Sequence, residues 1–192
     1  MLIVGQGLAG TLLAWELEQN GADFRMVDAG HAEAASRVAA GIVNPITGQR
    51  LVKSGRFDEL RPLARETYRG IEQKLGVTLW REMRIWRRFA IDAEWRTWSE
   101  KQARGELAPQ GGTGNREGFW IEGAAQLDVA ALLRATREHW QKTGRLVEAT
   151  AGLVRKRAPH ELVVLCTGAS LRTEPAFAFV PWTIAKGELL TL

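Results

Sequence analysis

The sequence predicts an α/β fold in which a Rossmann-like domain is combined with parts of a smaller antiparallel-sheet domain. The apolar run Met1–Val4 leads directly into the glycine-rich segment Gly5–Gly10, and a second apolar run, Phe24–Val27, follows a helical stretch. A third run, Leu162–Leu165, is continuously apolar, which is typical of a parallel strand buried on both faces. Strands that alternate with helical segments in this way indicate a parallel sheet.

The first 28 residues have the features of a β-α-β nucleotide-binding unit. Met1–Val4 predicts a buried strand, and Thr11–Gln19 predicts a helix. Between them, Gly5-Gln6-Gly7-Leu8-Ala9-Gly10 forms a complete G-x-G-x-x-G. The second strand, Phe24–Val27, ends at Asp28, which is where this unit places its acidic residue.

Each residue type of this unit has a physical task. Gly5 permits a tight turn, Gly7 lets backbone amides approach a pyrophosphate, and Gly10 lets the helix lie close to the sheet. The helix N-terminus offers N–H groups to phosphates. Asp28 can accept hydrogen bonds from a ribose diol and would repel a 2′-phosphate, which favours FAD or NAD over NADP. The alternative is a glycine-rich turn that binds no ligand. A nucleotide site is favoured because the strand, the turn, the helix, the second strand and the acidic residue all follow in the expected order and spacing.

A segment rich in small residues, Ala35–Pro45, follows the second strand. With this segment, the chain resembles the D-amino-acid-oxidase-like superfamily of flavoproteins, which includes glycine oxidase and sarcosine oxidase. The resemblance implies a FAD-binding domain of the glutathione-reductase type. It also implies that Ser36 and Arg37 lie along the pyrophosphate and that Ala39–Val43 pass close to the flavin ring. The alternative is a helix and turn of small residues without a ligand.

Two later strands complete the predicted cofactor domain. The segment Glu161–Ala169 resembles the superfamily's "D-x-V-V-x-A-T-G-A" strand, which implies that its Thr-Gly pair turns near the cofactor. Leu146–Ala149 predicts a further strand of the first sheet, and the resemblance implies that its backbone brackets the adenine. The implied cofactor is FAD, and the candidate cofactor-binding residues are Gly5, Gly7, Leu8, Ala9, Gly10, Asp28, Ala29, Ser36, Arg37, Ala39, Ala40, Gly41, Val43, Val147, Thr167 and Gly168.

The middle of the chain predicts helices and strands of the smaller domain. Phe57–Gly76 reads as an amphipathic helix, and Leu79–Ile91 as one or two strands. Asp92 is expected to cap a helix that runs to about Gln102. A helix is also expected over residues 127–142. The apolar positions of the first helix are Leu60, Leu63, Ala64, Tyr68, Ile71 and Leu75.

Between these elements lies a polar stretch, Glu106–Arg116, that contains Gly-Gly-Thr-Gly. No strand is predicted before its glycines, so we expect a mobile loop there. Phe119–Ile121 is expected to form a short strand.

Arginines and tryptophans alternate between residues 80 and 106. This combination can bind nucleic acid, and a relative of the superfamily is the oxidase domain of a tRNA-modifying enzyme. Acidic residues are mixed into the same stretch, which favours a solvated face over buried tryptophans. RNA therefore stays open as a partner, although a small amine or amino acid is favoured.

Composition agrees with an α/β enzyme. Of the 192 residues, 45% are hydrophobic, enough for a sizeable core, and no apolar run approaches the ~20 residues that cross a membrane. The chain starts directly with a strand, so we expect no signal peptide and a cytoplasmic location. The one cysteine, Cys166, excludes an intrachain disulfide and is expected in the core. His31, His139 and His160 lack zinc spacing, and the two later ones are expected at the surface; no metal site and no catalytic residue is assigned.

The resemblance also predicts the organisation of the chain. Residues 1–57 and 124–174 form the FAD-binding domain, 58–123 a helix and the start of the substrate domain, and 175–192 the start of its second segment. Pro181–Leu192 resembles the superfamily's strand that leads into that domain. The chain is therefore expected to be an N-terminal portion that self-associates or needs a C-terminal half.

The predicted function is oxidation of an amino acid or secondary amine by hydride transfer to FAD. Two alternatives stay open. One is an RNA-modifying oxidase domain of the same fold, and the other is a cofactor-binding fragment without catalytic activity.

Overall fold

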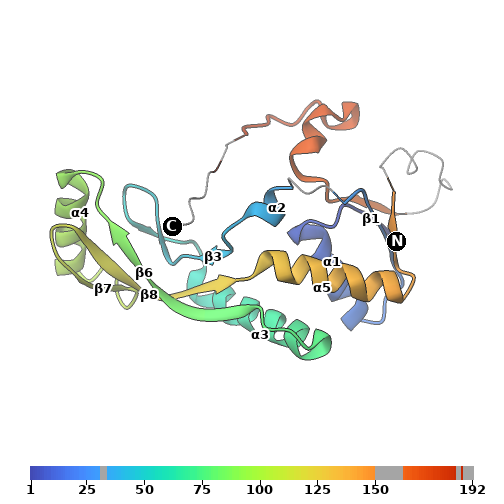
Figure 1. Cartoon of the computed structure of the whole chain (residues 1–192). Helices are drawn as coiled ribbons and strands as arrows, with labels where there is room; N and C mark the ends of the chain where they lie inside the picture. Colours follow the sequence, from blue (N-terminus) through green and yellow to red (C-terminus); the bar gives the residue numbers. More distant parts are fainter. Residues whose placement is uncertain (31–33, 150–161, 185–186, 188–192) are drawn as a thin grey trace. The chain divides into compact units, whose positions relative to one another are not determined.

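The computed structural model describes residues 1–30, 34–149, 162–184 and 187, and they form two compact units (Figure 1). The first unit combines residues 1–40 with 129–192, and the second spans 41–128. The predicted boundaries at 57/58 and 123/124 differ from this division, because residues 41–43 already pair with the antiparallel sheet of the second unit. The carbonyl of Gly41 accepts a hydrogen bond of 2.9 Å from the Leu127 amide. His31, His160 and most of the expected terminal strand lie outside the described residues.

The first unit is built on a four-stranded parallel sheet with the order β10-β1-β2-β9. Its strands are β1 (Leu2–Val4), β2 (Arg25–Asp28), β9 (Leu146–Glu148) and β10 (Val163–Leu165). The parallel sheet and the β-α-β order confirm the Rossmann-like α/β prediction. Its helices are α1 (Leu8–Gln19), α2 (Ala35–Val38) and α5 (Val129–Lys142), followed by the 3-10 helices η2 (Gly168–Thr173) and η3 (Pro175–Phe177).

An aromatic cluster joins α1 to α5 in this unit. The indole of Trp15 on α1 donates a hydrogen bond of 3.2 Å to the Thr136 hydroxyl on α5, and Trp140 packs against the same indole. His139, which was expected at the surface, is half-buried, because its ring stacks on Trp15 and its Nε2 lies 3.2 Å from the Glu18 carboxylate.

The strand predicted from the apolar run Leu162–Leu165 is less buried than expected. All three residues of β10 are half-buried, because β10 lies at the edge of the described sheet and pairs with β1 only. Cys166 directly follows this strand and is also half-buried rather than in the core. Burial still raises the pKa of its thiol, so the thiol keeps its proton at neutral pH.

The second unit contains an antiparallel sheet in the order β3-β8-β6, with β7 also paired to β8. The strands are β3 (Ile42–Val43), β6 (Trp80–Arg88), β7 (Gly111–Gly114) and β8 (Gly118–Leu127). The short strand expected at Phe119–Ile121 is thus part of a longer one. A hairpin of β4 (Ile46–Thr47) and β5 (Val52–Lys53) and the helices α3 (Phe57–Leu75) and α4 (Asp92–Ala103) complete the unit.

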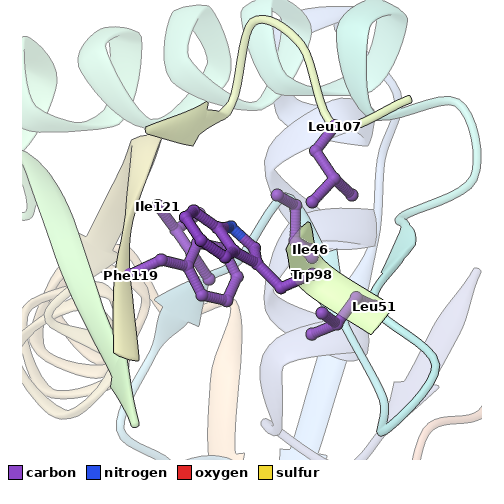
Figure 2. Close-up of a cluster of buried hydrophobic side chains, with 6 residues drawn as sticks. All are labelled: Ile46, Leu51, Trp98, Leu107, Phe119 and Ile121. Atoms are coloured by element: carbon purple, nitrogen blue, oxygen red, sulfur yellow. The ribbon is translucent and has the colours of Figure 1, made fainter. Parts of the chain in front are cut away.

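The core of the second unit is aromatic and aliphatic (Figure 2). Trp98 from α4 and Phe119 from β8 lie 5.6 Å apart between ring centroids, and Phe89 stacks on Phe119. Aliphatic side chains from the β4–β5 hairpin (Ile46 and Leu51) and from the segment before β7 (Leu107) belong to the same cluster. The cluster comprises Ile46, Leu51, Trp98, Leu107, Phe119 and Ile121.

Three local predictions for this unit are wrong. The Gly-Gly-Thr-Gly stretch forms β7 instead of a mobile loop. Helix α4 begins at Asp92 itself, with Ile91 as the N-cap residue. On α3, Leu60 and Leu63 are exposed, whereas Tyr68 and Ile71 are buried, because the helix buries its first residue, Phe57, and its second half but not the turns between them.

Among the basic and aromatic residues, the tryptophans divide into two groups. Trp80 and Trp98 are buried, in agreement with the interpretation as a face above buried tryptophans. Trp86 and Trp95, the other two tryptophans of the stretch, are half-buried, and the guanidinium of Arg116 lies over Trp95 at 4.5 Å from the ring centroid. Within the described part of the chain, no helix is long and apolar enough to span a membrane, and no cluster of side chains suits a metal ion.

Candidate cofactor site

The glycine-rich turn connects β1 to α1 in a geometry that only glycine allows. Gly5 has a φ of 102°, and a Cβ there would lie 2.5 Å from the carbonyl oxygen of Cys166. A Cβ at Gly10 would lie 2.1 Å from the carbonyl oxygen of Gly5. Both contacts are far inside van der Waals distance, so the two glycines are required for the turn and for the approach of helix to strand.

The middle glycine of the turn faces Ser36. A Cβ at Gly7 would lie 3.3 Å from the Ser36 hydroxyl oxygen, which also accepts a hydrogen bond of 3.1 Å from the Leu8 amide. The turn and the segment after β2 therefore meet at the N-terminus of α1. The first N–H groups of a helix have no acceptor within the helix, so this end can bind an anion.

Asp28 ends β2 at the same edge of the sheet. Its Oδ2 accepts a hydrogen bond of 2.8 Å from the Gln6 amide, and its Oδ1 accepts one of 2.7 Å from the Gly30 amide. Arg137 of α5 donates a third, of 2.8 Å, to Oδ1. Burial opposes ionisation, but the two amides and the guanidinium outweigh it and hold the pKa of Asp28 below its ordinary value.

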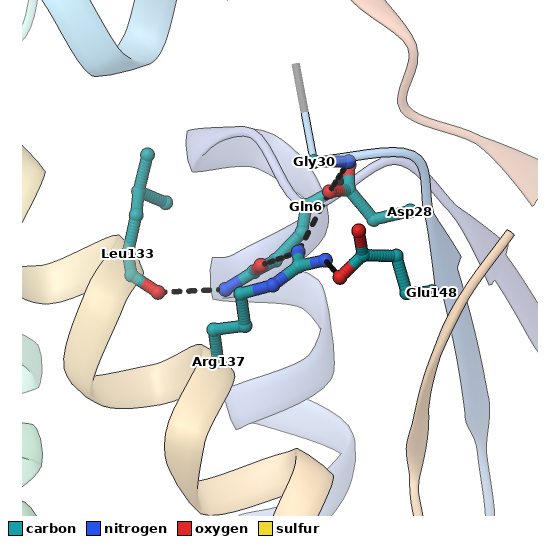
Figure 3. Close-up of polar contacts among 6 residues, drawn as sticks. All are labelled: Gln6, Asp28, Gly30, Leu133, Arg137 and Glu148. Carbon is teal, nitrogen blue, oxygen red and sulfur yellow. Dashed lines mark hydrogen bonds and ion pairs between the residues drawn. The ribbon is translucent and has the colours of Figure 1, made fainter. Parts of the chain in front are cut away.

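A network of polar side chains surrounds this carboxylate (Figure 3). The Gln6 side chain donates from Nε2 to the Leu133 carbonyl at 2.8 Å and accepts from Arg137 at 2.8 Å. Arg137 also donates to the Glu148 carboxylate at 2.9 Å. Asp28 and Glu148 lie opposite each other on neighbouring strands.

Sequence reasoning missed three residues of this network: Gln6, Arg137 and Glu148. One signal for Arg137 is present in the sequence. It follows Leu133 by one helical turn and precedes Trp140, both buried on α5. A cation on the buried face of a helix needs an anionic partner, so its position indicates a carboxylate nearby.

A cleft with a volume of about 440 Å³ opens beside this network. It combines two apolar side chains with three guanidinium groups and one carboxylate, so it suits an anionic ligand with an apolar part. The residues that line it are Gly30, Arg37, Ala130, Leu133, Arg134, Arg137 and Glu148.

Most of the predicted site residues belong to the first unit, and two belong to the second. Gly5, Gly7, Leu8, Ala9, Gly10, Asp28, Ala29, Ser36 and Arg37 gather around the α1 N-terminus and the end of β2, and Thr167 and Gly168 follow β10. Val147 lies on β9, with 56% of its surface exposed. Ala39 and Ala40 end the first segment of the first unit, whereas Gly41 and Val43 belong to the second unit.

The β-α-β unit, its three glycines and its terminal acid define a nucleotide-binding protein of the Rossmann-like class. A model of the family described as FAD dependent oxidoreductase (DAO) matches residues 1–192. The chain therefore belongs to this family, whose cofactor is FAD. No curated protein matches the sequence.

Solved structures share the fold at low sequence identity. Iminodiacetate oxidase from Chelativorans sp. BNC1 aligns with a TM-score of 0.53 and 20% identity, over 78% of this chain and 46% of that one. Glycine oxidase from Bacillus cereus ATCC 14579 aligns with a TM-score of 0.54 and 18% identity, over 77% and 46%. L-Amino acid deaminase from Proteus vulgaris aligns with a TM-score of 0.51 and 17% identity, over 79% and 41%. The matched part is less than half the length of each of these proteins.

The residues of the first unit fit FAD. Gly7 carries no side chain, so its backbone can approach a diphosphate beside the Ser36 hydroxyl, which would lie 3.3 Å from a Cβ placed at Gly7. The α1 N-terminus offers N–H groups and a partial positive charge for two phosphates. Asp28 is held ionised at the sheet edge, where a ribose diol can donate to it.

Proposed function

We propose that this chain binds FAD through the first unit and contributes to an enzyme that oxidises a C–N bond of an amino acid or a secondary amine. One observation carries the proposal. The turn Gly5–Gly10, the hydroxyl of Ser36 and the carboxylate of Asp28 converge at the carboxyl edge of a parallel sheet. Ligands of open α/β folds bind at this edge.

The residues of the chain would bind and orient the cofactor. The N–H groups at the start of α1 would bind the diphosphate, with the Ser36 hydroxyl beside them. Asp28 would accept hydrogen bonds from the adenosine ribose, and Val147 on the neighbouring strand β9 would lie against the adenine. Bound FAD would supply the hydride acceptor.

The proposed substrate class rests on the structural neighbours. Their names state that they act on iminodiacetate, which is a secondary amine, on glycine and on L-amino acids. A small amine or amino acid is therefore the proposed substrate here, in a protein in which this chain supplies the cofactor site. A location in the cytoplasm stays a prediction.

The cofactor part of the proposal is tested by absorption spectroscopy of the purified protein. The parent should show the flavin bands, and Gly7→Val should lose them, because its side chain would occupy the surface that faces the pyrophosphate. Gly55→Val is the matched control, since no atom lies within 4 Å of a Cβ placed there. A Gly7→Val protein that folds and retains FAD as the parent does would contradict the proposed site.

The substrate part is tested by measuring flavin reduction with glycine, L-amino acids and iminodiacetate, and separately with modified tRNA. Reduction by the small amines supports the proposal. Reduction by tRNA alone would assign the chain to an RNA-modifying oxidase instead. Bound FAD that no substrate reduces would make the chain a cofactor-binding fragment.

A further inference from the structure

We infer that Arg137 is a positioning residue that selects which oxygen of Asp28 is available to a ribose hydroxyl. The inference rests on the proposed FAD site and deepens it, because it assigns a task in ribose recognition to a helix that is distant from the glycine-rich motif in the sequence. Arg137 lies on α5, 109 residues beyond Asp28.

The guanidinium of Arg137 joins three parts of the site. Its Nη1 donates to Oδ1 of Asp28 and to Oε1 of Gln6, each at 2.8 Å, and its Nη2 donates to Oε2 of Glu148 at 2.9 Å. Gln6 belongs to the glycine-rich turn, Asp28 ends β2 and Glu148 ends β9. Only 13% of the Arg137 side chain is exposed, and its contacts to Asp28 and Gln6 are partly buried, whereas the Glu148 side chain is 64% exposed.

A count of acceptor sites shows what this arrangement does to Asp28. An ionised carboxylate has about four lone-pair sites, two on each oxygen. Among the described residues, Oδ1 already accepts from Gly30 and Arg137, whereas Oδ2 accepts only from Gln6. The remaining acceptor site is therefore on Oδ2, and it is Oδ2 that a ribose hydroxyl would meet.

Arginine suits this task better than lysine. A guanidinium is planar and presents several N–H donors in a fixed fork, so it can bridge two carboxylates and an amide at once. An ammonium in its place would reach only some of the three partners. Without the bridge, Oδ1 would gain a free acceptor site that competes with Oδ2 for the ribose, and only the amides of Gln6 and Gly30 would hold the carboxylate.

The test measures recognition of the ribose hydroxyls rather than overall stability. The Kd of the chain, freed of any co-purified flavin, is measured by calorimetry for ADP and for 2′,3′-dideoxy-ADP, which lacks both hydroxyls. The ratio of the two Kd values reports the reading of the ribose. A merely structural role of Arg137 would weaken both nucleotides equally and leave the ratio unchanged.

Four proteins are compared: the parent, Arg137→Met, Arg137→Lys and the control Lys142→Met. Lys142 lies on the same helix and is exposed, so the control removes the same charge without the bridge. We expect the parent to prefer ADP by about tenfold or more, the size of a charge-assisted hydrogen bond. Arg137→Met should lower the ratio, Arg137→Lys should lower it less, and Lys142→Met should leave it as in the parent.

The outcomes separate this inference from the proposed function. A parent that binds ADP without preference, or does not bind it, contradicts the proposed ribose site, and the inference falls with it. A parent that prefers ADP, together with an Arg137→Met protein that keeps the same ratio, overturns the inference alone. If Arg137→Met does not fold, the ratio of Arg137→Lys decides, and an unchanged ratio there overturns the inference.

Discussion

Two glycine clusters, one in each unit, look alike in the sequence and do different things in the structure. Gly5-x-Gly7-x-x-Gly10 forms the turn between β1 and α1, and two of its glycines face backbone carbonyls. The stretch Gly111–Gly114 forms strand β7, which pairs with β8. In that strand, a Cβ at Gly111 would lie 2.5 Å from the Leu107 Cβ, and one at Gly114 would lie 2.5 Å from the Phe119 Cβ.

The comparison shows that close packing alone does not make a glycine cluster a ligand site. Both clusters exclude side chains because other atoms approach closely. Only the first lies at the carboxyl edge of a parallel sheet and at the N-terminus of a helix, where N–H groups face outward. The second brings backbone against the Phe119 side chain of the hydrophobic core.

The largest expected effect is that of Gly10→Ala on the first cluster. The added methyl group would lie 2.1 Å from the Gly5 carbonyl oxygen, and neither backbone can move without separating α1 from β1. We expect a loss of about 4 kcal/mol in the free energy of unfolding, measured by urea denaturation.

The control for this change is Gly70→Ala on α3. No atom lies within 4 Å of a Cβ placed at Gly70, so alanine should stabilise this helix by about 0.5–1 kcal/mol. A Gly10→Ala protein as stable as the parent would mean that the helix and strand are not in the contact described.

The next effect tests the second cluster. In Gly114→Ala the methyl group would overlap the Phe119 side chain at 2.5 Å and the Gly118 carbonyl oxygen at 2.7 Å. We expect a loss of about 3 kcal/mol in stability, seen in the same denaturation experiment, with flavin binding unaffected. An unchanged denaturation midpoint would mean that Gly111–Gly114 is a mobile loop, as the sequence suggested, and would contradict the close packing described for the second cluster.

The two clusters also show which parts of the fold can be predicted from sequence. Strands β1 and β2 are short apolar runs bounded by Gly5 and Asp28, so their pattern is local and their register with α1 follows from the motif. Strand β7 has glycine at three of its four positions and shows no alternation of side chains. Its pairing depends on β8, a partner that lies outside any local window.

The candidate site divides in the same way. Asp28 could be predicted because its distance from the glycine-rich turn is fixed by one β-α-β unit. For Arg137, the sequence indicates only a need for some carboxylate, and not that this carboxylate is Asp28, because the helix that carries Arg137 follows the whole second unit. His139 was missed for a related reason: its stacking on Trp15 depends on two helices that are distant in the sequence.

A smaller effect is expected on FAD affinity, which tests the ligand site proposed at the first glycine cluster. Asp28→Ala removes the carboxylate that would accept from the ribose, and we expect a loss of about 1.5–3 kcal/mol in FAD binding, or roughly tenfold to a hundredfold in Kd. Fluorescence titration with FAD measures it.

The matched control is Asp23→Ala, because Asp23 is an exposed acid just before the amino end of the same strand β2. Its Kd for FAD should equal that of the parent. Equal affinity in the Asp28→Ala protein would remove Asp28 from the proposed site.

The smallest effect is a dependence of stability on pH that belongs to the first unit alone. The pKa of Asp28 in the folded protein is lowered, since the hydrogen bonds from Gln6, Gly30 and Arg137 outweigh the effect of burial. A carboxyl group with a lowered folded pKa stabilises the fold above its unfolded pKa, and this contribution is lost as the pH falls through the folded pKa. Below about pH 4, the free energy of unfolding of the parent should therefore fall more steeply than that of Asp28→Asn, by at most about 1.4 kcal/mol per pH unit for one proton.

The measurement is urea denaturation at a series of acidic pH values, with Asp23→Asn as the control that keeps the parent's slope. Parallel curves for the parent and Asp28→Asn would mean that Asp28 titrates alike in the folded and unfolded chain, and the bridge from Arg137 to this carboxylate would not hold it ionised.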